Sequence, residues 1–154
     1  MPNLDALDHE THIRRTLELA REAADRGNGP YGSLLVLDGE VVMEERNRES
    51  TDDDIALHPE LTLARRAARE LSPDERERAI MYTSTEPCPM CAGGIAIASL
   101  GAVVFSVSCD AAADIRGDEP GFSCEAVFES KGADIAVRGP VLPDEGAEVH
   151  REHY

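Results

Sequence analysis

The sequence predicts an α/β protein in which helices cover both faces of a mixed β-sheet. Two observations carry this prediction. Segments with helical and strand periodicity alternate along the chain, and the composition, 42% hydrophobic and 30% charged, is that of a globular protein. The length of 154 residues suits one domain. We therefore expect residues 1–154 to form a single domain, with the polar segment 139–154 as a C-terminal surface tail.

The first part of the chain predicts a helix followed by a β-hairpin. Residues 11–26 carry apolar side chains at helical spacing, and the Gly- and Pro-containing segment 27–30 ends that helix. Residues 33–37 form a short apolar run that is typical of a strand. Asp38-Gly39 is a strong hairpin-turn signal, so residues 41–44 are expected to return as the second strand.

The rest of the chain predicts strands separated by helices. Proline stands at the start of two of these helices, where its missing N–H and fixed φ are tolerated. Apolar runs bounded by polar or glycine residues indicate the strands. The expected elements are helices at 59–71 and 89–98, strands at 79–84, 103–107 and 134–137, and two short helices within 109–131.

The chain is strongly acidic. It has 31 acidic residues against 15 basic ones, a net charge of −16, and Lys131 is its one lysine. An acidic surface repels phosphate backbones, and the arginines are dispersed without a basic tail, which argues against a nucleic-acid partner. Acid enrichment with few lysines also resembles proteins of salt-loving organisms, in which high salt screens such repulsion. A halophilic origin is therefore a competing explanation of the charge.

The sequence also predicts a location. The first ten residues have no apolar segment of the secretory type. The longest apolar-rich run, 92–107, is interrupted by glycine and serine and is too short to span a bilayer. We expect a cytoplasmic protein without a membrane segment, whose four cysteines are thiols or metal ligands rather than disulfides.

One pair of motifs carries chemistry. His58-Pro59-Glu60 is followed thirty residues later by Pro87-Cys88-Pro89-Met90-Cys91. Zinc at a catalytic site takes three protein ligands and keeps a fourth position for water. Cys88 and Cys91, three apart in the first turn of a helix, point the same way, and the helix N-terminus favours their thiolates. His58 completes the set, and Glu60 lies beside the metal, where it can move protons.

Other interpretations of the cysteines and histidines are open. A structural zinc knuckle or two buried thiols would also use a Cys-x-x-Cys pair, but no second pair stands at the spacing that a four-ligand site needs. Cys109 and Cys124 are expected to be ordinary buried thiols. The remaining histidines stand in two pairs near polar termini, where surface positions are expected: His9 and His12, and His150 and His153.

The motif pair resembles the zinc-dependent cytidine-deaminase-like superfamily, whose signature is H-x-E followed by P-C-x-x-C. The resemblance covers residues 11–114, and the string TSTEPCPMCAGGI is most similar to bacterial guanine deaminases and tRNA adenosine deaminases. It implies a three-layer α/β/α sandwich around a five-stranded mixed sheet. It also implies that His58, Cys88 and Cys91 bind Zn²⁺, that Glu60 is the catalytic proton shuttle, and that the protein is a homodimer.

Four further residues are candidates through this resemblance. Relatives carry an asparagine eleven residues before the ligand histidine, and Asn47 stands at that position, where an amide suits a base edge. Tyr31 stands where relatives place an aromatic near the base, although a core tyrosine is an equal alternative. Asp110 begins a DAA segment and is either a substrate contact or a helix N-cap. Tyr154 is either a lid or part of a frayed tail.

The favoured function is zinc-dependent hydrolytic deamination of a free nucleobase or nucleoside, guanine first, with release of ammonia. The alternatives are a cytosine- or cytidine-type deaminase, tRNA adenosine-to-inosine editing, and a non-catalytic zinc-stabilised scaffold. The carboxylate of Glu60 argues against the scaffold, because a structural site does not need it. Pro59 stands where most relatives have alanine, and it leaves the identity of the substrate open.

Overall fold

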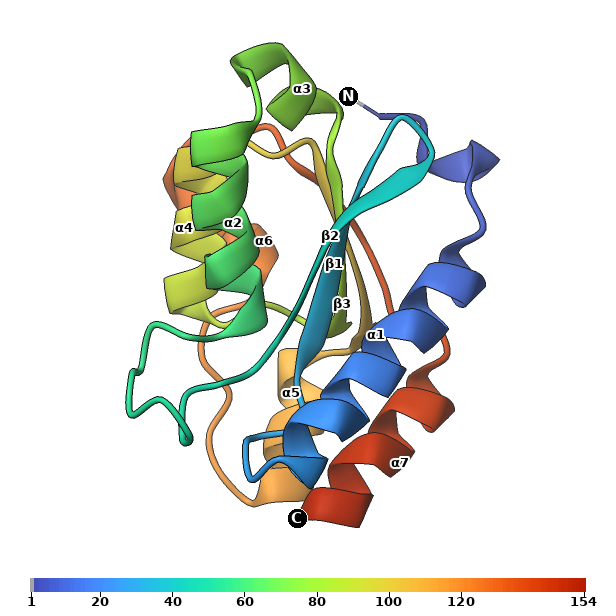
Figure 1. The fold of residues 1–154 in the computed structure, drawn as a ribbon, viewed down its shortest axis with the longest axis vertical. Helices are drawn as coiled ribbons and strands as arrows, with labels where there is room; N and C mark the ends of the chain where they lie inside the picture. Colours follow the sequence, from blue (N-terminus) through green and yellow to red (C-terminus); the bar gives the residue numbers. More distant parts are fainter. Residues whose placement is uncertain (1) are drawn as a thin grey trace.

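The computed structural model describes residues 2–154 and confirms the α/β class (Figure 1). A five-stranded mixed sheet has the order β2-β1-β3-β4-β5. β1 is antiparallel to both of its neighbours, and β3, β4 and β5 are parallel. The strands are β1 (Gly32–Leu37), β2 (Glu40–Arg46), β3 (Ile80–Thr85), β4 (Ala102–Val107) and β5 (Ala136–Arg138).

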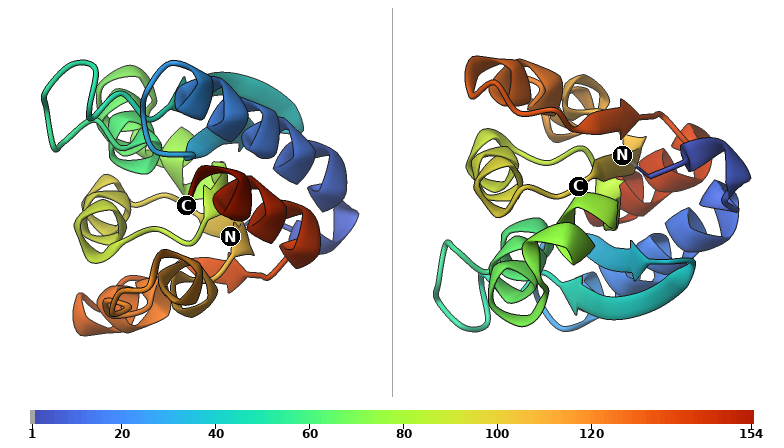
Figure 2. Two further views of the ribbon diagram at one scale, coloured as in Figure 1. Left: turned by 90° about the horizontal axis from the view of Figure 1, so that it is seen from below. Right: turned by 90° about the horizontal axis from the view of Figure 1, so that it is seen from above.

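The helices lie on both faces of this sheet, as Figure 2 shows from two ends. On one face lie α2, α4 and α6, and on the other lie α1 and α7. The helical elements are η1 (Leu4–Ala6), α1 (His9–Asp25), α2 (Pro59–Glu70), α3 (Pro73–Arg78), α4 (Pro89–Ala98), α5 (Cys109–Arg116), α6 (Cys124–Ser130) and α7 (Pro143–His153).

The strand period of two divides the core between the two faces. Met81 and Val103 join the cluster under α2, α4 and α6, whereas their neighbours Tyr82 and Val104 join the cluster under α1 and α7. Strands β1, β3 and β4 are buried over their whole length. This explains why they are almost continuous apolar runs rather than alternating ones.

The fold brings three helix starts to one end of the sheet. The carboxyl ends of the parallel strands β3 and β4 lead directly into α4 and α5, and the loop after β2 leads into α2. Open α/β sheets bind ligands at the carboxyl ends of their strands. The motif residues are therefore placed at the end of the sheet where a site is expected.

The expected surface tail at 139–154 is wrong, because most of it is helix α7. This helix packs beside α1 (Figures 1 and 2) and over β4. It buries Val149 and His150. Gly146 allows the close approach, since a Cβ there would collide with the Ser106 side chain of β4. The expectation of surface positions for the histidines is correspondingly wrong for His150, which is 1% exposed.

A second unpredicted element is the short helix α3. Ser72 caps it, with its side chain accepting a hydrogen bond from the Glu75 N–H while the Glu75 side chain accepts one from the Ser72 N–H. This capping box and Pro73 are sequence signals for a helix start. Over residues 2–154, none of the helices combines the length and apolar character needed to cross a membrane.

Candidate metal centre and active site

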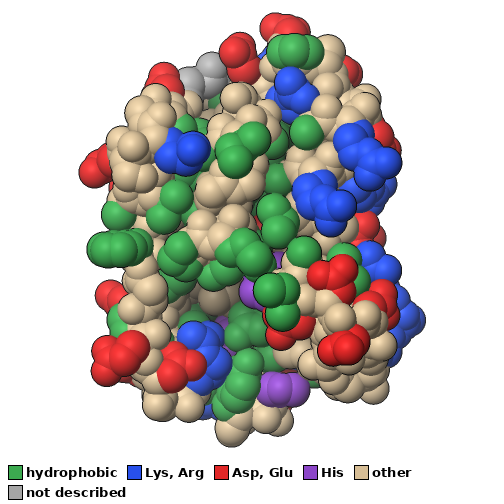
Figure 3. Space-filling view, turned by 90° about the vertical axis from the view of Figure 1, so that its left-hand side faces the viewer, with side chains coloured by type: hydrophobic (Ala, Val, Ile, Leu, Met, Phe, Trp, Pro, Cys, Tyr) green, Lys and Arg blue, Asp and Glu red, His purple; other side chains and the backbone are tan. Residues whose placement is uncertain are grey.

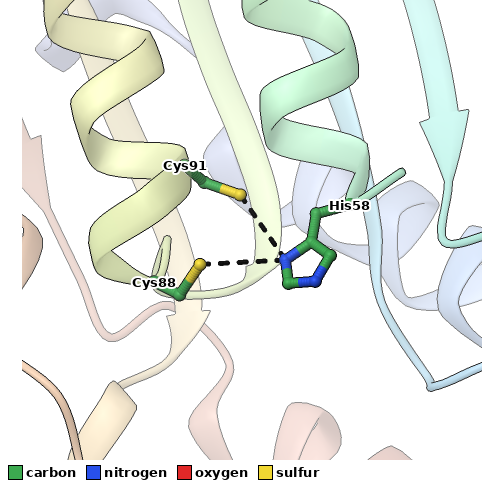
Figure 4. Close-up of side chains that lie close together, drawn as sticks. All are labelled: His58, Cys88 and Cys91. Atoms are coloured by element: carbon green, nitrogen blue, oxygen red, sulfur yellow. Dashed lines mark hydrogen bonds between the residues drawn. The ribbon is translucent and has the colours of Figure 1, made fainter. Parts of the chain in front are cut away.

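Two helix N-termini hold the three predicted metal ligands. His58 is the N-cap of α2 and Cys88 the N-cap of α4, and each is followed by a proline in the first turn. Cys91 lies in the first turn of α4. The Nδ1 atom of His58 lies 3.7 Å from Sγ of Cys88 and 3.6 Å from Sγ of Cys91 (Figure 4). The predicted triad is thus brought together, its ligand atoms all within 4.8 Å of one another.

This arrangement fits zinc. A zinc ion about 2.1 Å from a nitrogen and about 2.3 Å from a sulfur, in tetrahedral geometry, holds those two atoms about 3.6 Å apart. The two measured separations agree with that value. The donor set of one imidazole and two thiols supplies three ligands, which is the number at catalytic rather than structural zinc sites.

Hydrogen bonds set the protonation of the triad. The bond from Cys91 and the one with His58 lower the pKa of Cys88 to about 4, whereas the bond to Cys88 and burial raise the pKa of Cys91. The Cys88 sulfur and the Glu49 carboxylate raise the pKa of His58 to about 9. Cys88 is therefore poised as a thiolate, the form that binds metal.

Glu49 orients the imidazole. Its Oε1 atom lies 2.7 Å from Nε2 of His58, on the ring nitrogen that does not face the sulfurs. When the ring gives up one proton to bind a metal, this carboxylate keeps the other proton on Nε2 and leaves the lone pair of Nδ1 for the metal. Nothing in the motif spacing indicates Glu49, because it lies in the loop before α2 and reaches His58 only in the folded chain.

Glu60 lies next to the triad without belonging to it. It stands in the first turn of α2, is 5% exposed, and its side chain lines the same cavity as His58 and Cys88. Burial, together with the nearby Cys88 charge, raises the pKa of Glu60 to about 7. A carboxyl group in such a position can both take up and release a proton near neutral pH.

The cavity has a volume of about 490 Å³ and is walled by several predicted residues. Asn47 is buried, and its Oδ1 accepts the Glu49 N–H at 2.8 Å, which leaves the amide NH₂ for a ligand. Tyr31 lines the wall beside Gly29, where a Cβ would collide with the tyrosine ring. The Tyr31 hydroxyl lies 3.0 Å from the Tyr154 hydroxyl, so Tyr154 lies on the cavity wall rather than in a frayed tail.

Asp110 does not join this site. The α5 residues on the cavity wall are Cys109, Ala112 and Arg116, which share one helical face, and the exposed Asp110 lies on another. The alternative role is also not found, since Ser108 is the N-cap of α5. Cys124 is buried as expected, whereas Cys109 is half-buried and faces the cavity.

Besides Glu49, the cavity residues that were not predicted include Arg116 and Glu86. Arg116 reaches the wall from the last turn of α5, and the spacing 109, 112, 116 is the signal that could have indicated that face. Glu86 lies just before the cysteine motif and is 8% exposed. Its two oxygens accept the backbone N–H groups of Cys109 and Cys124, each at 2.9 Å, so it joins the starts of α5 and α6.

The chain matches the family model described as the cytidine and deoxycytidylate deaminase zinc-binding region over residues 7–107. It belongs to this family. The family, together with the cluster of His58, Cys88 and Cys91, makes the protein a zinc-dependent deaminase, a hydrolase that acts on C–N bonds.

Several family members are similar over most of the chain. A guanine deaminase of Bacillus subtilis is 37% identical over 114 residues, 73% of each protein. A tRNA-specific adenosine deaminase of the same organism is 31% identical over 96 residues, 62% of this chain and 60% of that protein. The structure of guanine deaminase from Nitrosomonas europaea superposes with a TM-score of 0.81 at 21% identity, covering 96% of this chain and 85% of that one, and this likeness shows the shared fold.

Proposed function

We propose that the protein deaminates guanine, replacing its 2-amino group by oxygen to give xanthine and ammonia. The observation that carries the proposal is a zinc triad and a buried carboxylate that share one cavity. Its volume, about 490 Å³, falls within the range of small-molecule pockets, roughly 300–1,000 Å³, and suits a free base. The similarity to the Bacillus guanine deaminase supports guanine over other bases.

The chain's residues have distinct roles in this reaction. His58, Cys88 and Cys91 would hold zinc, which supplies a Lewis acid that makes water nucleophilic at neutral pH. Glu60 takes a proton from the attacking water and gives it to a ring nitrogen of the base. Glu60 then takes the second proton of the water from the new C2 hydroxyl and passes it to the departing amine, so that the bond from C2 to the amino nitrogen breaks and the C2 oxygen becomes a carbonyl. Asn47 donates its amide N–H to the base, and Tyr31 and Tyr154 close the wall above it.

The test is ammonia release by the zinc-loaded protein from a panel of guanine, guanosine, cytosine, cytidine, adenine, adenosine and a tRNA anticodon stem-loop. We expect release from guanine. The Glu60→Gln variant should keep its zinc and lose about 10²–10⁴-fold in kcat, because the proton carrier is gone. Unchanged turnover in Glu60→Gln would overturn the mechanism.

The same panel separates the other functions. Release from the stem-loop alone would make the protein a tRNA-editing deaminase, and release from cytosine or cytidine alone a pyrimidine deaminase. The net charge of −16 disfavours the first. Zinc binding with no release from any compound would favour a non-catalytic scaffold. Each of these results would replace guanine as the proposed substrate.

We also propose that the protein is a homodimer. Helix α4 has no charged residue, and its outer side exposes apolar side chains. Ile97 is 76% exposed and Met90 is 40% exposed. Figure 3 shows hydrophobic side chains spread over this side of the molecule, and Phe122 is a further exposed one. An apolar face of this kind favours burial against a second copy. Light scattering after size exclusion should give twice the chain's 16.7 kDa, and a monomer at all concentrations would contradict the proposal.

We further propose that the protein is cytoplasmic and that it comes from a halophilic cell; the cysteines support the first proposal and the surface charge the second. All four cysteines are free, which suits the reducing cytoplasm, where thiols persist. The acidic, lysine-poor composition suits a halophilic cell, in which salt screens the repulsion between carboxylates.

A further inference from the structure

Arg116 is the one lysine or arginine among the described residues that line the active-site cavity. The acidic side chains there are Glu49, which contacts His58, Glu60, and Glu86, whose oxygens accept two backbone N–H groups. Arg116 bonds to Tyr31 and Asp118 rather than to any metal ligand. It is therefore a cation on the wall of the cavity that the deamination mechanism does not use.

The Arg116 guanidinium is fixed in position. Its Nε and Nη2 atoms donate to the two oxygens of Asp118 at 3.1 and 3.2 Å. Gly117, with φ of +78°, turns the chain at the end of α5 so that Asp118 follows directly. The Nη1 atom of Arg116 donates to the Tyr31 hydroxyl at 3.2 Å. A side chain locked by two partners loses little entropy when it binds a ligand.

These bonds use three of the five guanidinium N–H groups. One N–H on Nη1 and one on Nη2 have no partner among residues 2–154. Such a pair of N–H groups matches two neighbouring acceptors in one plane. The O6 and N7 atoms of guanine are such a pair, and arginine recognises them in this way in protein–DNA complexes.

We infer that Arg116 is a specificity-determining residue that reads the O6/N7 edge of a 6-oxopurine. This rests on the proposed function, which places C2 of guanine beside Glu60 and the metal ligands. O6 and N7 then lie on the side of the base away from the reacting carbon, where Arg116 can meet them. A 6-aminopurine has an amino group, a hydrogen-bond donor, beside N7. This donor would meet the N–H donors of the guanidinium instead of an acceptor. Asp118 and Tyr31 are the positioning residues for Arg116.

The test uses three compounds that carry the same 2-amino group. Guanine has oxygen at position 6, 2-aminopurine has hydrogen, and 2,6-diaminopurine has an amino group. In the wild-type protein kcat/KM should be highest for guanine. In Arg116→Met it should fall about 10–100-fold for guanine but clearly less for 2-aminopurine, which keeps the N7 acceptor and lacks O6. Arg116→Lys keeps the charge but lacks the paired N–H groups. It should therefore also lose the preference for guanine over 2-aminopurine.

The controls separate this inference from the proposed function. Arg78→Gln removes an exposed arginine that pairs with Asp38 at the far end of β1, and it should leave all three values unchanged. An equal fall for the three compounds in Arg116→Met and Arg116→Lys would show a structural role and overturn the inference alone. Wild-type protein that releases ammonia from none of the three would overturn the guanine proposal and the inference together.

Discussion

His58 is held on both sides, by sulfur at Nδ1 and by carboxylate at Nε2. Partners beyond the ligand shell fix the ring orientation and the tautomer of a metal-binding histidine, and their loss weakens metal affinity about 10–100-fold. We therefore expect Glu49→Gln to raise the zinc dissociation constant by that factor, measured by competition with a chromophoric chelator. Asp53→Asn makes the same charge change in the same loop without a contact to His58 and should have no effect. Equal affinities of the wild type and Glu49→Gln would contradict this role.

The motif residues could be predicted because their geometry is local. Cys88 and Cys91 face the same way whenever α4 begins where Pro89 indicates, and Pro59 sets the start of α2 in the same manner. Asn47 and Tyr31 also line the cavity as expected. Asp110 does not, because the phase of α5 turns Cys109 and Arg116 inward instead. Arg116 and Glu49 were missed because only the fold brings them to Tyr31 and His58.

The difference between predicted and observed elements has a similar origin. The helix at 89–98 is found with the predicted bounds, and the strands differ by one or two residues. Helix α7 was missed because its sequence is polar on most sides, and only Gly146, Val149 and His150 are buried. Ion pairs from Arg14 to Glu145 and from Arg21 to Glu152 tie it to α1. Such contacts join residues more than a hundred positions apart, so no local sequence pattern predicts them.

The docking of α7 makes stability depend on pH through His150. Burial lowers the pKa of this imidazole from 6.5 to about 4, and the positive charges of Arg116 on α5 and His153 on α7 act in the same direction. His150 also contacts the Thr85 hydroxyl, which bonds to Nε2 at 2.8 Å, and the rings of Tyr31 and Tyr154. The folded protein therefore holds His150 neutral at a pH where the unfolded chain protonates it.

The direction in which stability changes with pH follows from proton binding. Between pH 6.5 and about 4 the unfolded state binds more protons at His150, so stability falls as the pH falls, by up to about 3 kcal/mol. We expect His150→Gln to lose this part of the pH dependence, measured by urea unfolding between pH 7.5 and 4.5. His153→Gln, on the exposed end of the same helix, should keep most of the wild-type slope, because burial of His150 is the main cause of its lowered pKa and the His153 charge only a smaller one. The same slope in His150→Gln and the wild type would contradict the prediction.

At the scale of the whole molecule, two apolar clusters on the two faces of the sheet hold together a chain with a net charge of −16. Many of the bases are already paired with carboxylates, as Arg15 is with Glu44 at 2.7 Å. The acids in excess of the bases therefore repel one another across the surface. Repulsion of this kind opposes the compact state more than the expanded one.

Salt should therefore stabilise this protein. Raising ionic strength from 0.1 to 1 M shortens the Debye length from about 10 to about 3 Å. The free energy of unfolding should rise over this range, because screening of the excess acids outweighs the weakening of exposed ion pairs, each of which contributes about 0.2–1 kcal/mol. Replacing Glu40 and Glu129 by glutamine and Asp134 by asparagine, all exposed, should stabilise the protein at low salt and flatten its salt dependence. If unfolding free energy instead falls with salt, or if the triple variant keeps the full dependence, specific ion pairs rather than net repulsion govern the stability of this surface.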